Sequence, residues 1–180
     1  MQAFTKKRER STDMDNEVLR QIYRKYQREL YLYLYALCKS HELAEDLLQE
    51  TFLKALLALP DGHTNMRAWL YMVARNLFFN YSKKEKYIAG MDELEEVADE
   101  NREGMLEQLL VEERSRLLYR ALQHLDRMKR EVLLLQYFAE LSQKEIAAVL
   151  HLTPENVRVL AYRGKRELKS YLEGNGYDIS

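Results

Sequence analysis

The sequence predicts an all-α protein of two small helical domains joined by an acidic linker, with a helix-turn-helix in the second domain. Apolar residues recur at spacings of three and four over residues 15–86 and again over residues 107–173, which predicts amphipathic helices. Only six glycines and two prolines occur in 180 residues, too few for the many turns of an all-β fold. Residues 87–106 contain two of these glycines and most of an acidic cluster, so we expect them to link the domains.

The composition favours a soluble protein of a reducing compartment. Apolar residues make up 47% of the chain and charged residues 32%, an ordinary balance for a globular protein. The single cysteine, Cys38, excludes an internal disulfide framework. No apolar run approaches the roughly 18 residues of a membrane span, and residues 1–10 are charged with no apolar signal region behind them. We therefore expect a cytoplasmic protein with no direct membrane insertion.

The formal net charge of −1 hides a strong segregation of charge along the chain. Residues 67–86 carry a net charge of +4, residues 158–169 also carry +4, and residues 92–113 between them carry −9. Attraction to phosphates depends on the local patch rather than on the total, so two basic segments are compatible with nucleic-acid binding. Solvated helix faces explain the same charges equally well.

The helix predicted over residues 43–59 carries two stripes. The first contains Leu48, Phe52 and Leu56 and is expected to face the core of its own domain. The second, called the clamp stripe below, mixes acidic, amide and leucine side chains and contains Asp46, Gln49, Glu50, Leu53 and Leu57. A helix with one face in water should not carry a second row of leucines. Either a partner protein covers this stripe, or the helix is buried on both sides within its own bundle.

The helix predicted over residues 67–84 gathers rings, amides and cations on one side. Leu70, Ala74 and Tyr81 are expected to point inward. The other side carries Trp69, Met72, Asn76, Phe79, Asn80 and Lys83. Flat rings stack on unpaired bases and cations hold phosphates, so this side suits single-stranded nucleic acid. An aromatic core stripe with a solvated rim fits the same spacing.

A helix-turn-helix is predicted over residues 142–168. Residues 142–150 form a short amphipathic helix, and a tight turn follows at His151. The small Ala147 allows the two helices to approach, and Val157, ten residues later, fixes the angle between them. Glycine usually occupies the position of His151, where the backbone must be left-handed, and histidine tolerates that conformation better than most residues.

The second helix of this unit has a well-marked start and a basic outer face. Thr153 supplies an N-cap hydroxyl, Pro154 the first helical position and Glu155 an acid for the positive helix end. Base-reading and phosphate-binding side chains are expected to face outward, namely Glu155, Asn156, Arg158, Val159, Tyr162, Arg163, Lys165, Arg166 and Lys169. The helix cap, the tight turn and the basic outer face together predict that this unit binds DNA.

No catalytic site is predicted. The four histidines and Cys38 show no metal-ligand spacing, and His41 lacks the second histidine of a zinc-protease helix. There is no Gly-rich phosphate loop, and no nucleophile has a base suggested nearby. We therefore expect no enzyme activity, no metal and no cofactor.

Three ordered motifs resemble those of bacterial sigma factors of RNA polymerase. The segment LAEDLLQETFL (residues 43–53) resembles the part of these proteins that binds the clamp of the polymerase. The segment RAWLYMVARN (residues 67–76) resembles the part that melts and reads the −10 promoter element. REVLLLQYF (130–138), LSQKEIA (141–147) and NVR (156–158) resemble the domain that binds the polymerase flap and the −35 element. With only these two domains and a short linker, the chain resembles the extracytoplasmic-function (ECF) group.

The resemblance implies partners and residue roles. It implies that the clamp stripe binds core RNA polymerase. It implies that single-stranded −10 DNA contacts the −10 face, which comprises Asp61, His63, Asn65, Trp69, Arg75, Asn76, Asn80, Lys83 and Lys84. It implies that duplex −35 DNA contacts the −35 face, which comprises Thr153, Glu155, Asn156, Arg158, Tyr162, Arg163, Arg166 and Lys169. An anti-sigma factor, often membrane-bound, is a further implied partner.

The sequence departs from the family pattern at three positions. Asp126 replaces a common proline, His151 a common glycine, and Leu160 an arginine that often projects to DNA. The leading functional hypothesis is a dissociable sigma factor that directs promoter recognition, melting and transcription initiation. The alternative is a stand-alone helix-turn-helix regulator whose first domain senses a ligand or dimerises.

Overall fold

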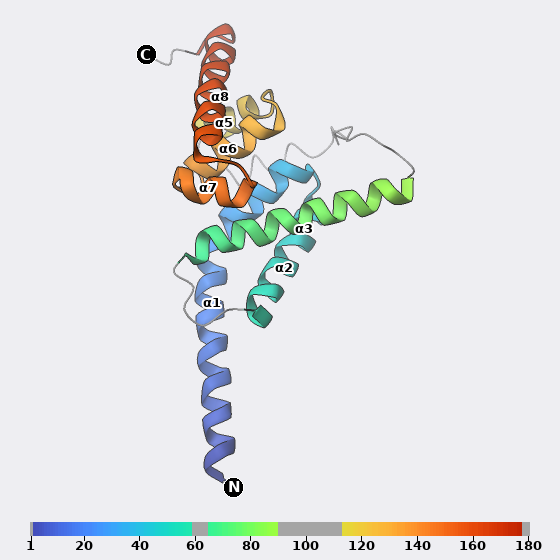
Figure 1. Cartoon of the computed structure of the whole chain (residues 1–180), viewed down its shortest axis with the longest axis vertical. Helices are drawn as coiled ribbons and strands as arrows, with labels where there is room; N and C mark the ends of the chain where they lie inside the picture. Colours follow the sequence, from blue (N-terminus) through green and yellow to red (C-terminus); the bar gives the residue numbers. More distant parts are fainter. Residues whose placement is uncertain (1, 59–64, 90–112, 178–180) are drawn as a thin grey trace.

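The computed structural model describes residues 2–58, 65–89 and 113–177, and these contain seven helices and no strand (Figure 1). The all-α class is therefore confirmed. The helices are α1 (Gln2–Cys38), α2 (His41–Ala58), α3 (Met66–Ala89), α5 (Glu113–Leu122), α6 (Arg127–Tyr137), α7 (Gln143–Leu150) and α8 (Pro154–Gly174). None of the helices in these residues is long and apolar enough to span a membrane.

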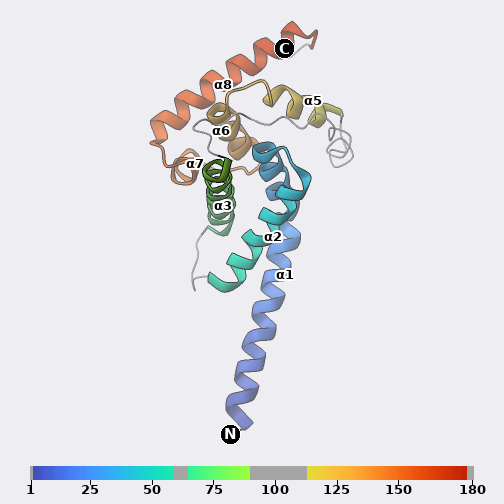
Figure 2. The same cartoon turned by 90° about the vertical axis from the view of Figure 1, so that its right-hand side faces the viewer.

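The first domain is built from α1, α2 and α3. The C-terminal half of α1 packs against the other two helices, while its N-terminal half extends away from them (Figures 1 and 2). Leu30 and Leu34, one helical turn apart, are fully buried, as are Leu70 and Ala74 of α3. This spacing places one row of each helix in a shared core and leaves the opposite rows available for other contacts.

The last residue of α1, before the turn to α2, is Cys38, the only cysteine of the chain. Its thiol donates a hydrogen bond to the carbonyl oxygen of Ser40 at 3.2 Å. Burial raises the pKa of this thiol to about 11. The thiol therefore stays protonated at neutral pH and acts as a small apolar side chain of the turn.

The second domain packs α8 across α6 and α7, with α5 beside α8. Val132, Ile146 and Val157 are fully buried at its centre. Gly164 allows the close approach of α8 to α6, because a Cβ atom there would lie 3.2 Å from Leu133 Cδ1 and 3.3 Å from Lys129 Cβ. This packing holds α8 with one face against the core and the other in solvent.

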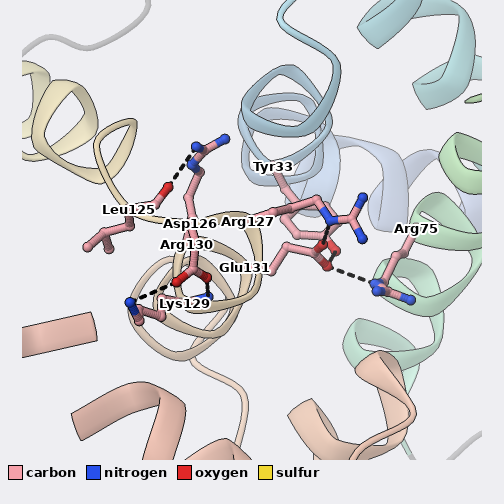
Figure 3. A network of polar contacts seen from close by, with 8 residues as sticks. All are labelled: Tyr33, Arg75, Leu125, Asp126, Arg127, Lys129, Arg130 and Glu131. Carbon is pink, nitrogen blue, oxygen red and sulfur yellow. Dashed lines mark hydrogen bonds and ion pairs between the residues drawn. The ribbon is translucent and has the colours of Figure 1, made fainter. Parts of the chain in front are cut away.

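The buried side chain of Arg130 stabilises the turn between α5 and α6 through hydrogen bonds. Its guanidinium donates hydrogen bonds to the carbonyl oxygens of Leu122 at 3.1 Å, Gln123 at 3.1 Å and Leu125 at 2.9 Å. Part of this network is drawn in Figure 3. Carbonyl groups at the end of a helix have no partner within that helix. The Leu122 carbonyl oxygen also accepts a hydrogen bond from the N–H of Leu125 at 3.2 Å, so Arg130 adds to that bond and supplies a donor to the carbonyl oxygens of Gln123 and Leu125.

Asp126, which replaces the common proline, is the N-cap of α6. Its carboxylate accepts a hydrogen bond from the backbone N–H of Lys129 at 3.0 Å and pairs with the Lys129 ammonium at 2.7 Å (Figure 3). Partial burial alone would raise the pKa of Asp126, but the hydrogen bonds from Lys129 outweigh it and hold the pKa below its ordinary value. The same ammonium pairs with Glu167 at 2.6 Å, which ties α6 to α8.

The two domains lie against each other. α3 of the first domain contacts α7 of the second, and the two helices lie side by side in Figures 1 and 2. The rings of Tyr35 and Tyr119 also meet across this boundary, with centroids 6.5 Å apart. The buried apolar residues of both domains consequently form one continuous cluster.

Candidate nucleic-acid and polymerase interfaces

The turn of the helix-turn-helix has the predicted geometry. Ser142 and Glu145 form a capping box at the start of α7, each side chain bonding the backbone N–H of the other residue. His151 ends the helix with φ 56° and ψ 44°, the left-handed conformation expected there, and its N–H donates to the carbonyl oxygen of Ala147. The position thus keeps the required backbone geometry without glycine, at some cost in strain.

The predicted start of α8 and the exposure of its outer residues are also confirmed. Thr153 Oγ1 accepts a hydrogen bond from the N–H of Asn156 at 3.2 Å, and Pro154 occupies the first turn. Val157 and Ala161 face the core. Every residue of the −35 face is exposed, namely Thr153, Glu155, Asn156, Arg158, Tyr162, Arg163, Arg166 and Lys169. Leu160 is half-buried against the core, so it provides no projecting group.

An open hollow of about 270 Å³ extends the −35 face toward α6. Its lining residues are Lys129, Tyr162, Arg163, Arg166, Glu167 and Ser170. Lys129 was absent from the predicted set because it lies more than 30 residues away in sequence, and only the packing of α6 on α8 brings it there. Arginines, a phenol and a hydroxyl around an open hollow suit contacts with DNA backbone.

The clamp stripe lies in solvent. Leu53 is 54% exposed and Leu57 77% exposed, and Asp46, Gln49 and Glu50 are exposed beside them. Burial of α2 on both sides within its own bundle is therefore wrong. Exposed leucines in a row with acidic side chains are typical of a helix that docks on a partner protein.

Two side chains expected to face inward lie in solvent instead. Leu56 of α2 is 43% exposed and Tyr81 of α3 is 40% exposed. At about 100° per residue, Leu56 lies 40° around the helix from buried Phe52 and about 60° from exposed Leu53, so it falls on the border of the two stripes. Tyr81 lies in the second half of α3, where its neighbours Asn80, Lys83 and Lys84 are also exposed.

The residues of the −10 face fall into an outer and an inner group. The outer group, Asn76, Asn80, Lys83 and Lys84, is exposed along α3. The inner group, Asn65, Trp69 and Arg75, is partly or largely buried. Asp61 and His63 lie outside the described residues. The guanidinium groups of Arg75 and Arg127 lie 4.4 Å and 4.9 Å from the centroid of the Phe79 ring.

Asn65 lies at the start of α3 and has two partners. Its Oδ1 accepts a hydrogen bond from the N–H of Ala68 at 3.1 Å, which caps the helix. Its side-chain amide donates to the carboxylate of Glu145 in α7. Arg67, two residues later, pairs with Glu29 of α1 at 3.3 Å and with Glu140 of the second domain at 3.4 Å.

A buried ionic network joins the two domains at Glu131, which sequence reasoning did not single out (Figure 3). Glu131 of α6 has no solvent exposure. Its carboxylate pairs with Arg75 at 2.7 Å and with Arg127 at 3.8 Å, and it accepts a hydrogen bond from the Tyr33 hydroxyl at 3.4 Å. Burial, with the nearby Glu131 carboxylate, raises the pKa of Tyr33 well above its ordinary value, so the phenol remains a donor. The sequence held one sign that this carboxylate is buried, because Glu131 directly precedes four apolar residues, 132–135.

The fold and these surfaces define a helical protein of two domains, the second with a helix-turn-helix. The models of Sigma-70 region 2 and Sigma-70 region 4 match residues 22–87 and 115–168, respectively. The chain is 31% identical to the ECF RNA polymerase sigma factor SigM of Bacillus subtilis, over 83% of this chain and 92% of SigM. It is 34% identical to the RNA polymerase sigma factor YlaC of the same species, over 82% of this chain and 88% of YlaC. The chain therefore belongs to the ECF sigma factors of RNA polymerase.

Two solved structures share the fold. CnrH in complex with the cytosolic domain of CnrY has a TM-score of 0.63 and 22% identity, covering 89% of this chain and 91% of CnrH. The sigma factor RpoE in complex with the anti-sigma factor NepR from Bartonella quintana has a TM-score of 0.65 and 19% identity, covering 86% of this chain and 96% of RpoE. The two region models and the two curated relatives cover both domains of this chain, so the alternative of a stand-alone regulator is not supported.

Proposed function

We propose that this sigma factor binds core RNA polymerase through α2, reads duplex −35 DNA with α8 and holds the −10 strand on α3. One observation supports this assignment most strongly: the same chain exposes both the clamp stripe on α2 and the −35 face on α8. A DNA reader alone needs no second docking surface, whereas a promoter-recognition subunit needs one for the polymerase. The protein then acts in the cytoplasm with the polymerase and performs no chemistry of its own.

The second domain also offers a surface for the polymerase flap, the partner implied for this domain. An apolar groove of about 250 Å³ lies between α5, α6 and α8, and its apolar lining includes Leu118, Leu122, Leu133, Phe138, Leu168 and Leu172. Exposed Lys165 and Lys169 also line it. Leucines with flanking lysines suit an apolar helix that carries acidic residues. The groove lies beside α8, so flap and DNA would bind the domain together.

Holoenzyme carrying Arg163→Ala should lose ~1–3 kcal/mol of discrimination at one −35 position, since a base-reading arginine bonds a single base pair. Lys169→Ala is the matched comparison. A phosphate-binding lysine should weaken binding evenly across sequences and reduce the slope of log affinity against log salt by about one. Selection of bound promoters from a randomised library, with affinities at several salt concentrations, separates the two effects. Unchanged selectivity in Arg163→Ala would make that residue a backbone contact only.

An anti-sigma factor is the proposed regulator. The sigma factor RpoE was solved in complex with the anti-sigma factor NepR, and we extend that kind of partner to this chain. An inhibitor that covers the clamp stripe would exclude the polymerase by occupying Leu53 and Leu57, the two most exposed leucines of α2.

A further inference from the structure

We propose that Val159 is a specificity-determining residue of α8, whose exposed apolar side chain reads the C5-methyl group of a thymine in the −35 element. The inference rests on the proposed reading of duplex −35 DNA by α8, and it adds a base, an atom of that base and a residue to that function. Val159 is not one of the residues that define the −35 face above.

Val159 occupies the most outward position in the N-terminal half of α8. At about 100° per residue, it lies about 160° around the helix axis from Val157 and, on the other side, about 160° from Ala161. Both of those side chains are buried in the core of the domain, at 0% and 4% exposure. Val159 therefore points directly away from the core, in the direction from which a recognition helix reaches into the major groove.

The packing of the domain does not account for a valine at this position. The side chain is 42% exposed, so it contributes little apolar burial to the core. Valine is also a weaker helix former than lysine or arginine, because its β-branch restricts its rotamers in a helix. Tyr162, one turn later and 66% exposed, is its neighbour on the helix surface. Two adjacent apolar side chains are thus displayed at the centre of a polar face.

The polymerase flap does not explain this pair, because the apolar groove proposed for the flap lies on the other side of α8. Leu168, which lines that groove, lies about 180° around the helix from Val159. The hollow on the −35 face, by contrast, is lined by Tyr162, Arg163 and Arg166. The apolar pair therefore belongs to the surface that carries the proposed DNA-binding cations.

The base edges in the major groove determine which base suits Val159. Guanine, adenine and cytosine are distinguished there by their hydrogen-bond donors and acceptors, whereas thymine also presents a C5-methyl group that apolar side chains contact. The side chain of Val159 neither donates nor accepts a hydrogen bond. Exposed Asn156 and Arg163 nearby carry the groups that pair with adenine and guanine. The −35 element should therefore contain an A·T pair whose methyl group packs against Val159.

Deoxyuridine provides the direct test, because it lacks the methyl group of thymine and keeps every hydrogen-bonding group of the base. Holoenzyme is assembled from core polymerase and the full chain. The probe is a promoter duplex from the randomised-library selection, in which each −35 thymine of either strand is replaced in turn. At one position we expect deoxyuridine to weaken binding about fourfold, equivalent to ~0.8 kcal/mol for one methyl group removed from water.

Val159→Thr tests whether Val159 is the residue that senses the methyl group. Threonine keeps the shape and β-branch of valine but replaces one of its methyl groups with a hydroxyl group. The variant should bind the thymine and deoxyuridine promoters nearly equally. The matched control Val18→Thr changes a valine of similar exposure, 47%, on α1 and should keep the difference. A difference that persists in Val159→Thr would arise from DNA shape or from another residue and would overturn the proposal, as would the absence of any methyl-sensitive position.

Arg163→Ala separates this inference from the proposed function beneath it. Altered selectivity in Arg163→Ala, together with no methyl-sensitive position, would reject only the thymine contact. Unaltered selectivity in both Arg163→Ala and Val159→Thr, with no methyl-sensitive position, would also reject the reading of −35 DNA by α8. Val159→Thr holoenzyme that selects from the library again and loses the A·T preference only at the methyl-sensitive position would support both.

Discussion

Leu53→Glu is expected to weaken binding to core RNA polymerase by roughly 30- to 1000-fold, equivalent to about 2–4 kcal/mol. Leu53 lies in the middle of the clamp stripe, between Glu50 and Leu57, and is 54% exposed in the free protein. Docking would remove this leucine from water, whereas a glutamate would enter the interface without a partner charge. Size-exclusion chromatography with labelled protein and purified core polymerase measures the loss.

The fold should survive this substitution, because the side chain lies in solvent and contributes little to the core. Circular dichroism and the urea midpoint are expected to match those of the unsubstituted protein. Leu53→Met is the matched control, since methionine keeps an apolar side chain of similar volume, and it should retain binding. Equal binding by the glutamate and methionine variants would show that α2 does not dock on the polymerase.

Arg130→Ala is expected to lower the free energy of unfolding of the second domain by about 3–5 kcal/mol. The substitution removes a side chain that is 3% exposed, and with it the guanidinium donors to the carbonyl groups of Leu122, Gln123 and Leu125. Leu122 keeps the N–H of Leu125 as a donor at 3.2 Å, so the loss comes mainly from the charge-assisted hydrogen bonds to Gln123 and Leu125, at about 1.5–3 kcal/mol each. Urea unfolding followed by circular dichroism measures the change.

Two comparisons give this stability prediction its specificity. Arg130→Lys keeps the charge but lacks the planar fork that reaches several carbonyl groups, so it should recover only part of the loss. Arg158→Ala removes an exposed arginine of the same domain and should change stability by less than about 0.5 kcal/mol. A loss below about 1 kcal/mol in Arg130→Ala would mean that solvent satisfies these carbonyl groups.

Local chemistry explains why the helix-turn-helix could be predicted from the sequence. Thr153 and Pro154 determine where α8 begins through contacts within one turn. His151 and Ala147 set the preceding turn through a bond within the same unit. Because each of these contacts spans only a few residues, spacing along the chain was enough to place the outer face of α8.

The −10 face could be predicted only in part, because its inner half depends on contacts that are distant in sequence. Arg75 and Glu131 are 56 residues apart, and no periodicity in α3 indicates that another domain covers it. The clamp stripe was ambiguous for a related reason. A row of leucines has the same spacing whether a partner or the protein's own core covers it, so only the exposure of Leu53 and Leu57 in the structure decided between the two.

Run-off transcription on genomic fragments tests the central claim most directly. Core polymerase alone should give no discrete products, and addition of this protein should give transcripts with defined start sites. Upstream of each start we expect shared −35 and −10 sequences, and the Leu53→Glu variant should yield none of the transcripts. Identical transcripts with and without the protein would contradict the account.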